Sequence, residues 1–186
     1  MRAVLGIHPG GQGTPVEIQQ HHIYTDDQNR SHDIMLLELT NPTLIQPVPL
    51  PDCGPPNPLN IDDTVEIAGR ASMTMGPNNE RQPGRATVLQ CANTTVINCQ
   101  RLINCLQTNY QGFYATRQYQ HWKCYQSPGV STSPGDSGGG VVFNGRICGV
   151  HVFSGNATHA CVEAAGFMDV CRYMDWIVTT TGIPRP

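Results

Sequence analysis

The chain has 186 residues, of which only 13% are charged, and its formal net charge is −3. This length suits one all-β domain. Eleven basic residues stand against fourteen acidic ones, with no run of Lys or Arg that could follow a phosphate backbone. Nucleic acid is therefore excluded as a partner. The 19 Gly and 15 Pro are typical of many short strands joined by turns, and they favour an all-β class.

The eight cysteines are irregularly spaced and include no Cys-x-x-Cys pair, which favours disulfides in an oxidising compartment over a metal site. Glycosylation sequons begin at Asn29, Asn93 and Asn156. The apolar stretch before His8 is too short for a signal peptide or a membrane span. We therefore expect an extracellular protein whose beginning is missing from this chain. An intracellular β-domain with free thiols is the alternative that the absent signal leaves open.

The first half contains two apolar segments of strand length, at residues 16–23 and 34–39. Residues 47–60 follow, and their repeated prolines cannot sit inside a sheet ladder. This segment is interpreted as a connector between two β-rich halves.

The second half contains predicted strands at residues 64–68, 86–90, 141–143 and 146–153, separated by Gly, Pro and Asn turns. Two amphipathic stretches interrupt this pattern. Residues 95–106 place Val96, Cys99, Ile103 and Leu106 on one face, and residues 170–177 behave likewise. Both are predicted to form short helices.

The sharpest motif is Gly-Asp-Ser-Gly-Gly-Gly at residues 135–140, followed by the apolar segment 141–143. A nucleophilic serine needs an exposed hydroxyl and nearby backbone N–H groups directed at a developing oxyanion. Glycines allow the tight turn and the close approach of substrate that this requires. The same residue types are also common in surface turns, which is the simpler interpretation of the motif alone.

A second motif, Ser-His-Asp at residues 31–33, places Asp33 at the head of an apolar strand in the first half. Together the two motifs resemble the trypsin and chymotrypsin family, whose catalytic order along the chain is histidine, aspartate, serine. The likeness extends to the connector 47–60 and to the closing segment 170–177. It implies two antiparallel Greek-key β-barrels in one domain: a partial first barrel (1–46), a second barrel (61–169) and a C-terminal α-helix (170–181).

The resemblance also implies roles for individual residues. Ser137 would be the acylated nucleophile, and the N–H groups of Gly135 and Ser137 would form the oxyanion hole. Asp33 would orient a histidine. Asp136 would accept the new N-terminal ammonium formed by zymogen cleavage. The mechanism would use no metal and no organic cofactor.

Further positions resemble the substrate pocket of the family. Its floor would be Ser131, where an aspartate would select basic substrates, so strict basic specificity is not expected. The other pocket residues by resemblance are Thr132, Phe153, Ser154 and Gly166. The resemblance pairs Cys53 with Cys171 and Cys99 with Cys124, and assigns no partner to Cys91, Cys105, Cys148 and Cys161.

The catalytic histidine of the family lies in an Ala-Ala-His-Cys segment before the region that residues 1–6 resemble, so the chain is expected to begin too late to contain it. Among the seven histidines, His32 is expected at the surface because it alternates with Asp33 along a strand. His151 is expected to pack beside the second barrel. Loss of the general base would leave very little turnover.

These observations predict a secreted serine endopeptidase that hydrolyses peptide bonds through an acyl-enzyme on Ser137, truncated at its N-terminus and inactive as written. The expected partners are protein or peptide substrates and protease inhibitors, with no nucleic acid and no membrane, and the chain is expected to be a monomer. The alternative is a non-catalytic serine-protease homologue that keeps the fold as a protein-binding module.

Overall fold

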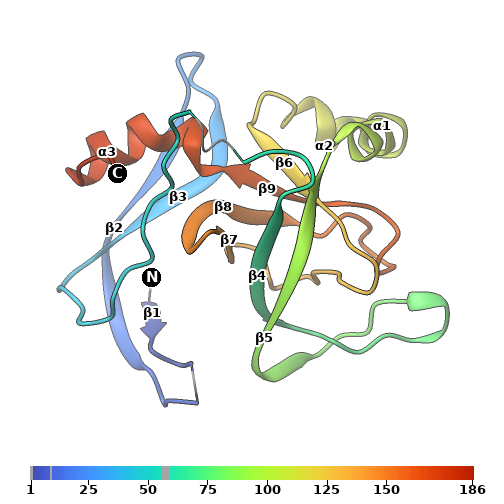
Figure 1. Cartoon of the computed structure of the whole chain (residues 1–186), viewed down its shortest axis with the longest axis horizontal. Helices are drawn as coiled ribbons and strands as arrows, with labels where there is room; N and C mark the ends of the chain where they lie inside the picture. The colour runs from blue at the N-terminus through green and yellow to red at the C-terminus, as the bar shows by residue number, and fades with distance from the viewer. Residues whose placement is uncertain (1, 9, 56–58) are drawn as a thin grey trace.

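The computed structural model describes residues 2–8, 10–55 and 59–186. Its N-terminal part is an open antiparallel sheet of three strands, β1 (Arg2–Leu5), β2 (Thr14–Thr25) and β3 (Ser31–Leu39), in the order β1-β2-β3. Figure 1 shows this sheet to one side of the remaining strands. The expected incomplete first barrel is thus an open sheet.

The following strands form a closed antiparallel barrel in the order β4-β5-β6-β9-β8-β7. They are β4 (Thr64–Ala71), β5 (Arg85–Ile97), β6 (Trp122–Tyr125), β7 (Gly140–Phe143), β8 (Arg146–Phe153) and β9 (Ala165–Asp169). Val65, Val96, Val141 and Phe167 meet in its interior with at most 3% of their surface exposed. Burial of such side chains is the main force that holds a closed barrel together. The predicted all-β fold with a complete second barrel is confirmed.

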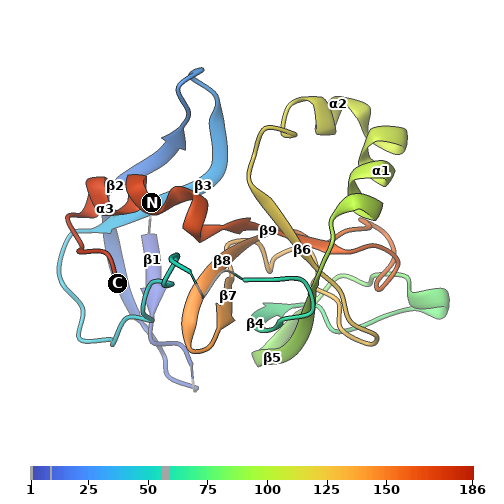
Figure 2. The same ribbon diagram turned by 45° about the horizontal axis from the view of Figure 1, so that its top comes forward.

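The helices lie outside the barrel. They are α1 (Gln100–Asn109), α2 (Gln111–Ala115) and α3 (Met174–Thr181), with 3-10 turns at Pro77–Asn79 and Val170–Tyr173. The short C-terminal helix is confirmed, and in Figures 1 and 2 α3 lies beside β2 and β3. Ile34 of β3, Met168 of β9 and Ile177 of α3 belong to one buried cluster. The apolar face of α3 thereby joins the open sheet to the barrel.

The helix predicted for residues 95–106 is wrong in its first part. Val96 belongs to β5, where it pairs with Tyr125 of β6, and α1 begins only at Gln100. The helical spacing of Val96 relative to Leu106 is coincidental, because Val96 faces the barrel core and Leu106 packs in a separate cluster. Barrel closure overrides the local amphipathic pattern here.

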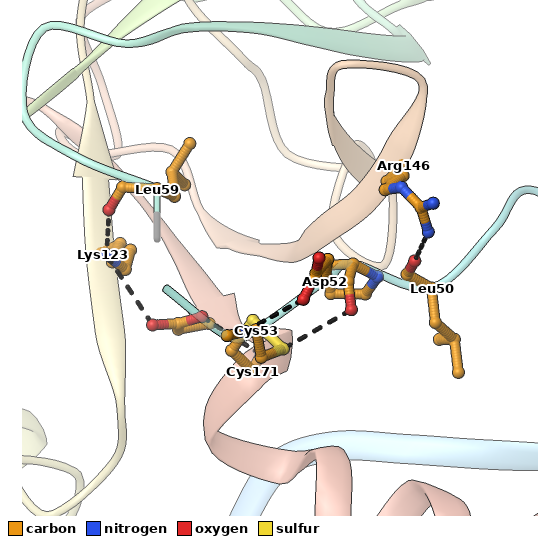
Figure 3. The surroundings of a disulfide bond; sticks show 10 residues. Leu50, Asp52, Cys53, Leu59, Lys123, Arg146 and Cys171 are labelled. Carbon is orange, nitrogen blue, oxygen red and sulfur yellow. Dashed lines mark hydrogen bonds and ion pairs between the residues drawn. A yellow bond between two sulfur atoms is a disulfide. The ribbon is translucent and has the colours of Figure 1, made fainter. Parts of the chain in front are cut away.

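Both expected disulfides are present, Cys53–Cys171 and Cys99–Cys124. Figure 3 shows the first of them, which joins the connector to the 3-10 turn at Val170–Tyr173. On either side of it, Lys123 Nζ donates to Leu59 O at 2.7 Å and Arg146 Nη1 donates to Leu50 O at 2.7 Å. The described part of the connector, residues 47–55 and 59–60, belongs to no strand. Side-chain donors, a 3.0 Å hydrogen bond from Ile147 N to Pro49 O and the disulfide fix its path.

The expectation that His32 lies at the surface is wrong. Its ring is buried with 4% exposed, and Nδ1 is hydrogen-bonded to Tyr173 Oη at 2.8 Å. Alternation along β3 does separate His32 from the exposed Asp33, but the inward face of that strand is covered by the C-terminal segment. The inward position of His32 therefore depends on a contact 141 residues away in the sequence.

None of the helices among the described residues has the length and apolar character needed to cross a bilayer. Within the same ranges, no three His, Cys, Asp or Glu side chains are grouped so that they could hold a metal ion.

Candidate active site

Ser137 lies in the loop between β6 and β7 and is exposed to solvent. The chain turns sharply on both sides of it, with φ of +110° at Gly135 and +85° at Gly138, a region that residues with a Cβ rarely adopt. Backbone hydrogen bonds of 2.8 Å from Gly138 N to His151 O and from His151 N to Gly139 O fasten this turn to β8. The glycines thus present the Ser137 hydroxyl on a rigid barrel.

The donors around Ser137 are available for a ligand. Its own hydroxyl makes only a 3.3 Å hydrogen bond to Val152 O. In the described part of the chain, no hydrogen bond uses the backbone N–H of Gly135 or of Ser137. An oxyanion hole requires two such amide donors directed at one point beside the nucleophile.

The Asp136 carboxylate lies against β4 and the segment that precedes the nucleophile. Its Oδ1 accepts a 2.9 Å hydrogen bond from Ala71 N, and its Oδ2 accepts one of the same length from Ser133 N. The carboxylate lies so close to Gly69 that a Cβ at that position would overlap Oδ1. A cavity of about 300 Å³ lies beside it, lined in part by Asp136, Arg81 and Ser131.

Three of the expected pocket residues, Ser131, Thr132 and Ser154, accept hydrogen bonds from a side chain that no motif marked, Arg81. Its guanidinium donates to five oxygens at 2.6–3.0 Å: Ser131 Oγ, Thr132 O, Ser133 Oγ, Ser154 O and Asn156 O. Three of these acceptors come from the segment before the nucleophile and two from the segment after β8. No sequence signal marks Arg81, because it lies in an irregular loop and reaches the pocket only through the fold.

Phe153 and Gly166, the other two expected pocket residues, are paired across β8 and β9. The Phe153 ring lies over Gly166 so closely that a Cβ on Gly166 would overlap it. The same ring meets Trp122 in a T-shaped contact, with 5.2 Å between the ring centroids. Gly166 thus makes room for the Phe153 ring.

Asp33 is the one expected catalytic residue that stands on the other sheet. It is exposed on β3, where its backbone N–H donates to Gln120 Oε1 at 3.2 Å. None of the interactions among the described residues joins Asp33 to Ser137. Nor does any described histidine hydrogen-bond to the Asp33 carboxylate or to Ser137 Oγ.

His151 lies on β8, which fastens the nucleophile turn, and is only 3% exposed. Its Nδ1 is hydrogen-bonded to Tyr125 Oη at 2.8 Å, and its Nε2 to Ser154 Oγ at 3.3 Å. Burial lowers the pKa of His151 to about 4, so the ring is neutral at pH 7. The same burial raises the pKa of Tyr125. This neutral pair links the barrel interior to the pocket residue Ser154.

A closed six-stranded barrel with an open sheet, a C-terminal helix and a glycine-framed exposed serine define a chymotrypsin-type serine protease fold. The sequence matches the family model described as Trypsin over residues 2–177. The chain therefore belongs to the trypsin family, as its motifs predicted.

Curated relatives agree. Glandular kallikrein of Sus scrofa is 25% identical over 179 residues, covering 93% of this chain and 65% of the relative. Trypsin-1 of Salmo salar is 29% identical over 162 residues, covering 82% of this chain and 57% of the relative. The chain thus spans about three fifths of the length of these two proteins.

Solved structures show the same fold. Neuropsin, a serine protease expressed in the limbic system of mouse brain, superimposes with a TM-score of 0.67 at 24% identity, over 90% of this chain and 72% of neuropsin. A scabies mite inactivated protease paralogue, S-D1, gives a TM-score of 0.68 at 19% identity, over 95% and 74%. Since both identities are below 25%, these likenesses concern the fold alone.

Proposed function

We propose that this protein is a serine-type endopeptidase that hydrolyses peptide bonds through an acyl-enzyme on Ser137. The observation that carries the proposal is the exposed Ser137 hydroxyl, together with the backbone N–H groups of Gly135 and Ser137, which make no hydrogen bond among the described residues. Attack of Oγ on a scissile carbonyl forms the new C–O bond, and the two N–H groups stabilise the oxyanion. The amine then leaves with a proton, and water hydrolyses the ester.

The other assigned residues would position the reacting groups and the substrate. Asp33 would orient the imidazole that removes the proton from Ser137. Asp136 anchors the nucleophile turn through Ala71 N and Ser133 N, and would accept the N-terminal ammonium formed by zymogen cleavage. The substrate side chain would enter the pocket formed by Ser131, Thr132, Phe153, Ser154 and Gly166. No step requires a metal or an organic cofactor.

A second function is favoured by one specific observation. Within the described residues no histidine is hydrogen-bonded to Ser137 Oγ, and in a comparable serine protease loss of the histidine lowers kcat by about 10⁶. The chain by itself would then turn over very slowly. It would act as a non-catalytic homologue whose pocket binds a protein segment without cleaving it.

An extracellular location is supported by the two disulfides, which persist in oxidising compartments. Asn29 and Asn93, which begin two of the sequons, are exposed and accessible to glycosylation. The relatives include a snake venom serine protease of Bothrops alternatus. We propose a secreted monomer that acts on protein or peptide substrates, is open to protease inhibitors, and engages neither nucleic acid nor membrane.

The test is labelling with a fluorophosphonate, which reacts with activated serines, on protein produced through a secretory route. Labelling of the wild-type protein that disappears in Ser137→Ala and persists in Ser31→Ala is the expected result, since Ser31 is an exposed serine on β3. Equal labelling of the wild-type protein and Ser137→Ala would refute the nucleophile assignment. No labelling of any of the three would favour the binding module.

A further inference from the structure

Arg81 lies in the loop between β4 and β5, the light green extension to the right of these strands in Figure 1. Its backbone is fixed at two places, by a β-bridge with Met75 and by a 2.8 Å hydrogen bond from Arg81 N to Thr158 O. The neighbouring Glu80 forms another bridge with His159. The loop is therefore attached to the segment that follows β8, and Arg81 is aimed into the pocket by a braced backbone.

The guanidinium joins the two walls of that pocket. Nη1 donates to Thr132 O at 2.6 Å and Ser133 Oγ at 3.0 Å, while Nη2 donates to Ser131 Oγ and Ser154 O, both at 3.0 Å. Nε completes the set by donating to Asn156 O at 3.0 Å. All five N–H donors of the side chain are thus used, and every acceptor is a neutral oxygen.

The positive charge of Arg81 has no ion-pair partner among the described residues. Asp136, a carboxylate whose charge acts on Arg81, directs both of its oxygens at backbone N–H groups instead. Burial lowers the pKa of Arg81, but a guanidinium keeps its proton in proteins. The pocket therefore contains a fixed, partly desolvated cation that no described carboxylate contacts.

This cation changes which substrate side chain the pocket can accept. A Lys or Arg side chain would bring a second positive charge against Arg81 and would meet no carboxylate at the floor, where Ser131 stands. A carboxylate would instead gain charge-assisted hydrogen bonds from the guanidinium. It can take the place of the Ser131 hydroxyl, because Ser131 Oγ also accepts from Cys161 N and donates to Thr132 O, both at 3.3 Å.

We propose that Arg81 is the specificity-determining residue of this site, and that it selects a peptide side chain carrying a carboxylate and excludes Lys and Arg. The inference deepens the proposed function and rests on it, since the same pocket would serve the endopeptidase or the binding module. It reverses the charge preference of a pocket whose floor is an aspartate.

The experiment measures equilibrium binding of fluorescent peptides by anisotropy to the full chain carrying Ser137→Ala, so that no peptide is cleaved. Three peptides differ only in one side chain, which is Glu, Gln or Lys. We expect the Glu peptide to bind about tenfold tighter than the Gln peptide, the effect of one charge-assisted hydrogen bond, and the Lys peptide to bind most weakly. Added Arg81→Gln should abolish the preference for Glu over Gln. Added Arg85→Gln, which removes an exposed positive charge from the start of β5, should leave it unchanged.

The wild-type pocket alone suffices to overturn the inference, even if Arg81→Gln fails to fold. Binding of the Lys peptide as tight as that of the Glu peptide would refute it while leaving the proposed function intact, and so would an unchanged preference in Arg81→Gln. If none of the three peptides binds either to the protein with Arg81 or to the Arg81→Gln variant, the pocket is not a substrate site. The proposed function then fails together with the inference.

Discussion

Lowering the pH from 7 to 5 should destabilise the barrel through His151. Its ring is almost fully buried, and its pKa is lowered from the usual 6.5 to about 4. Between these values the unfolded chain binds a proton that the folded chain does not. The stability that the neutral ring confers is therefore complete above about pH 6.5 and is lost as the pH falls towards 4.

The magnitude follows from the two pKa values. At pH 5 the unfolded histidine is mostly protonated and the folded one mostly neutral, so the free energy of unfolding falls by about 2 kcal/mol relative to pH 7. Urea unfolding of the wild-type protein, His151→Gln and His21→Gln at the two pH values measures it. His21 is exposed on β2 and serves as the matched control.

The pH-dependent loss in His151→Gln should be smaller than in the wild-type protein by about 2 kcal/mol, whereas His21→Gln should behave like the wild-type protein. Glutamine keeps a hydrogen-bonding group near Tyr125 but does not titrate. A loss of the same size in all three proteins would show that burial of His151 does not control acid stability, and the reasoning would be refuted.

Three further predictions concern packing and sulfur chemistry. Replacing both cysteines of Cys53–Cys171, which closes 118 residues, should lower the free energy of unfolding in urea by about 4–5 kcal/mol. The same change at Cys99–Cys124, which closes 25 residues, should lower it by about 3.5 kcal/mol. The reverse order would contradict the chain-entropy argument. Gly166→Ala should lower the free energy of unfolding by about 1–3 kcal/mol, because its Cβ would overlap Phe153. Gly112→Ala should leave the stability unchanged, because a Cβ there meets nothing within 4 Å. Equal melting temperatures for the two variants would contradict this prediction. Burial raises the pKa of Cys148 to about 12, so its thiol should resist alkylation in the folded protein. Peptide mapping should find it unmodified until the chain is unfolded. Fast alkylation of Cys148 in the folded protein would contradict its burial.

Most strands were predictable because their patterns are local. The segment 146–153 has the predicted bounds, since its valines and aromatic residue lie between a Gly turn and the loop at Ser154. The predicted strand at residues 86–90 proved to be part of β5, which extends to Ile97. Of the strands that escaped prediction, β6 (Trp122–Tyr125) and β9 (Ala165–Asp169) show neither alternation nor flanking glycines on both sides. Their pairing partners, and not their own sequences, make them strands.

The candidate site likewise contains features that the sequence predicts and features that it does not. The turn around Ser137 was predictable because glycines with positive φ are a local requirement. Arg81 was not, since its hydrogen bonds reach residues 50 to 75 positions away. His32 was misplaced for the same reason: alternation separates it from Asp33, but only the docking of the C-terminal segment decides which face of β3 is buried. Local patterns located the nucleophile, and tertiary contacts decide what surrounds it.

The most direct test of the central claim is to find the site of acylation. The protein is mixed with p-nitrophenyl acetate, quenched in acid and digested, and the peptides are mapped by mass spectrometry. The account predicts one acetyl group on the peptide that contains Ser137, and its loss in Ser137→Ala. Acetyl groups confined to lysines, with Ser137 unmodified, would contradict the assignment of Ser137 as a nucleophile.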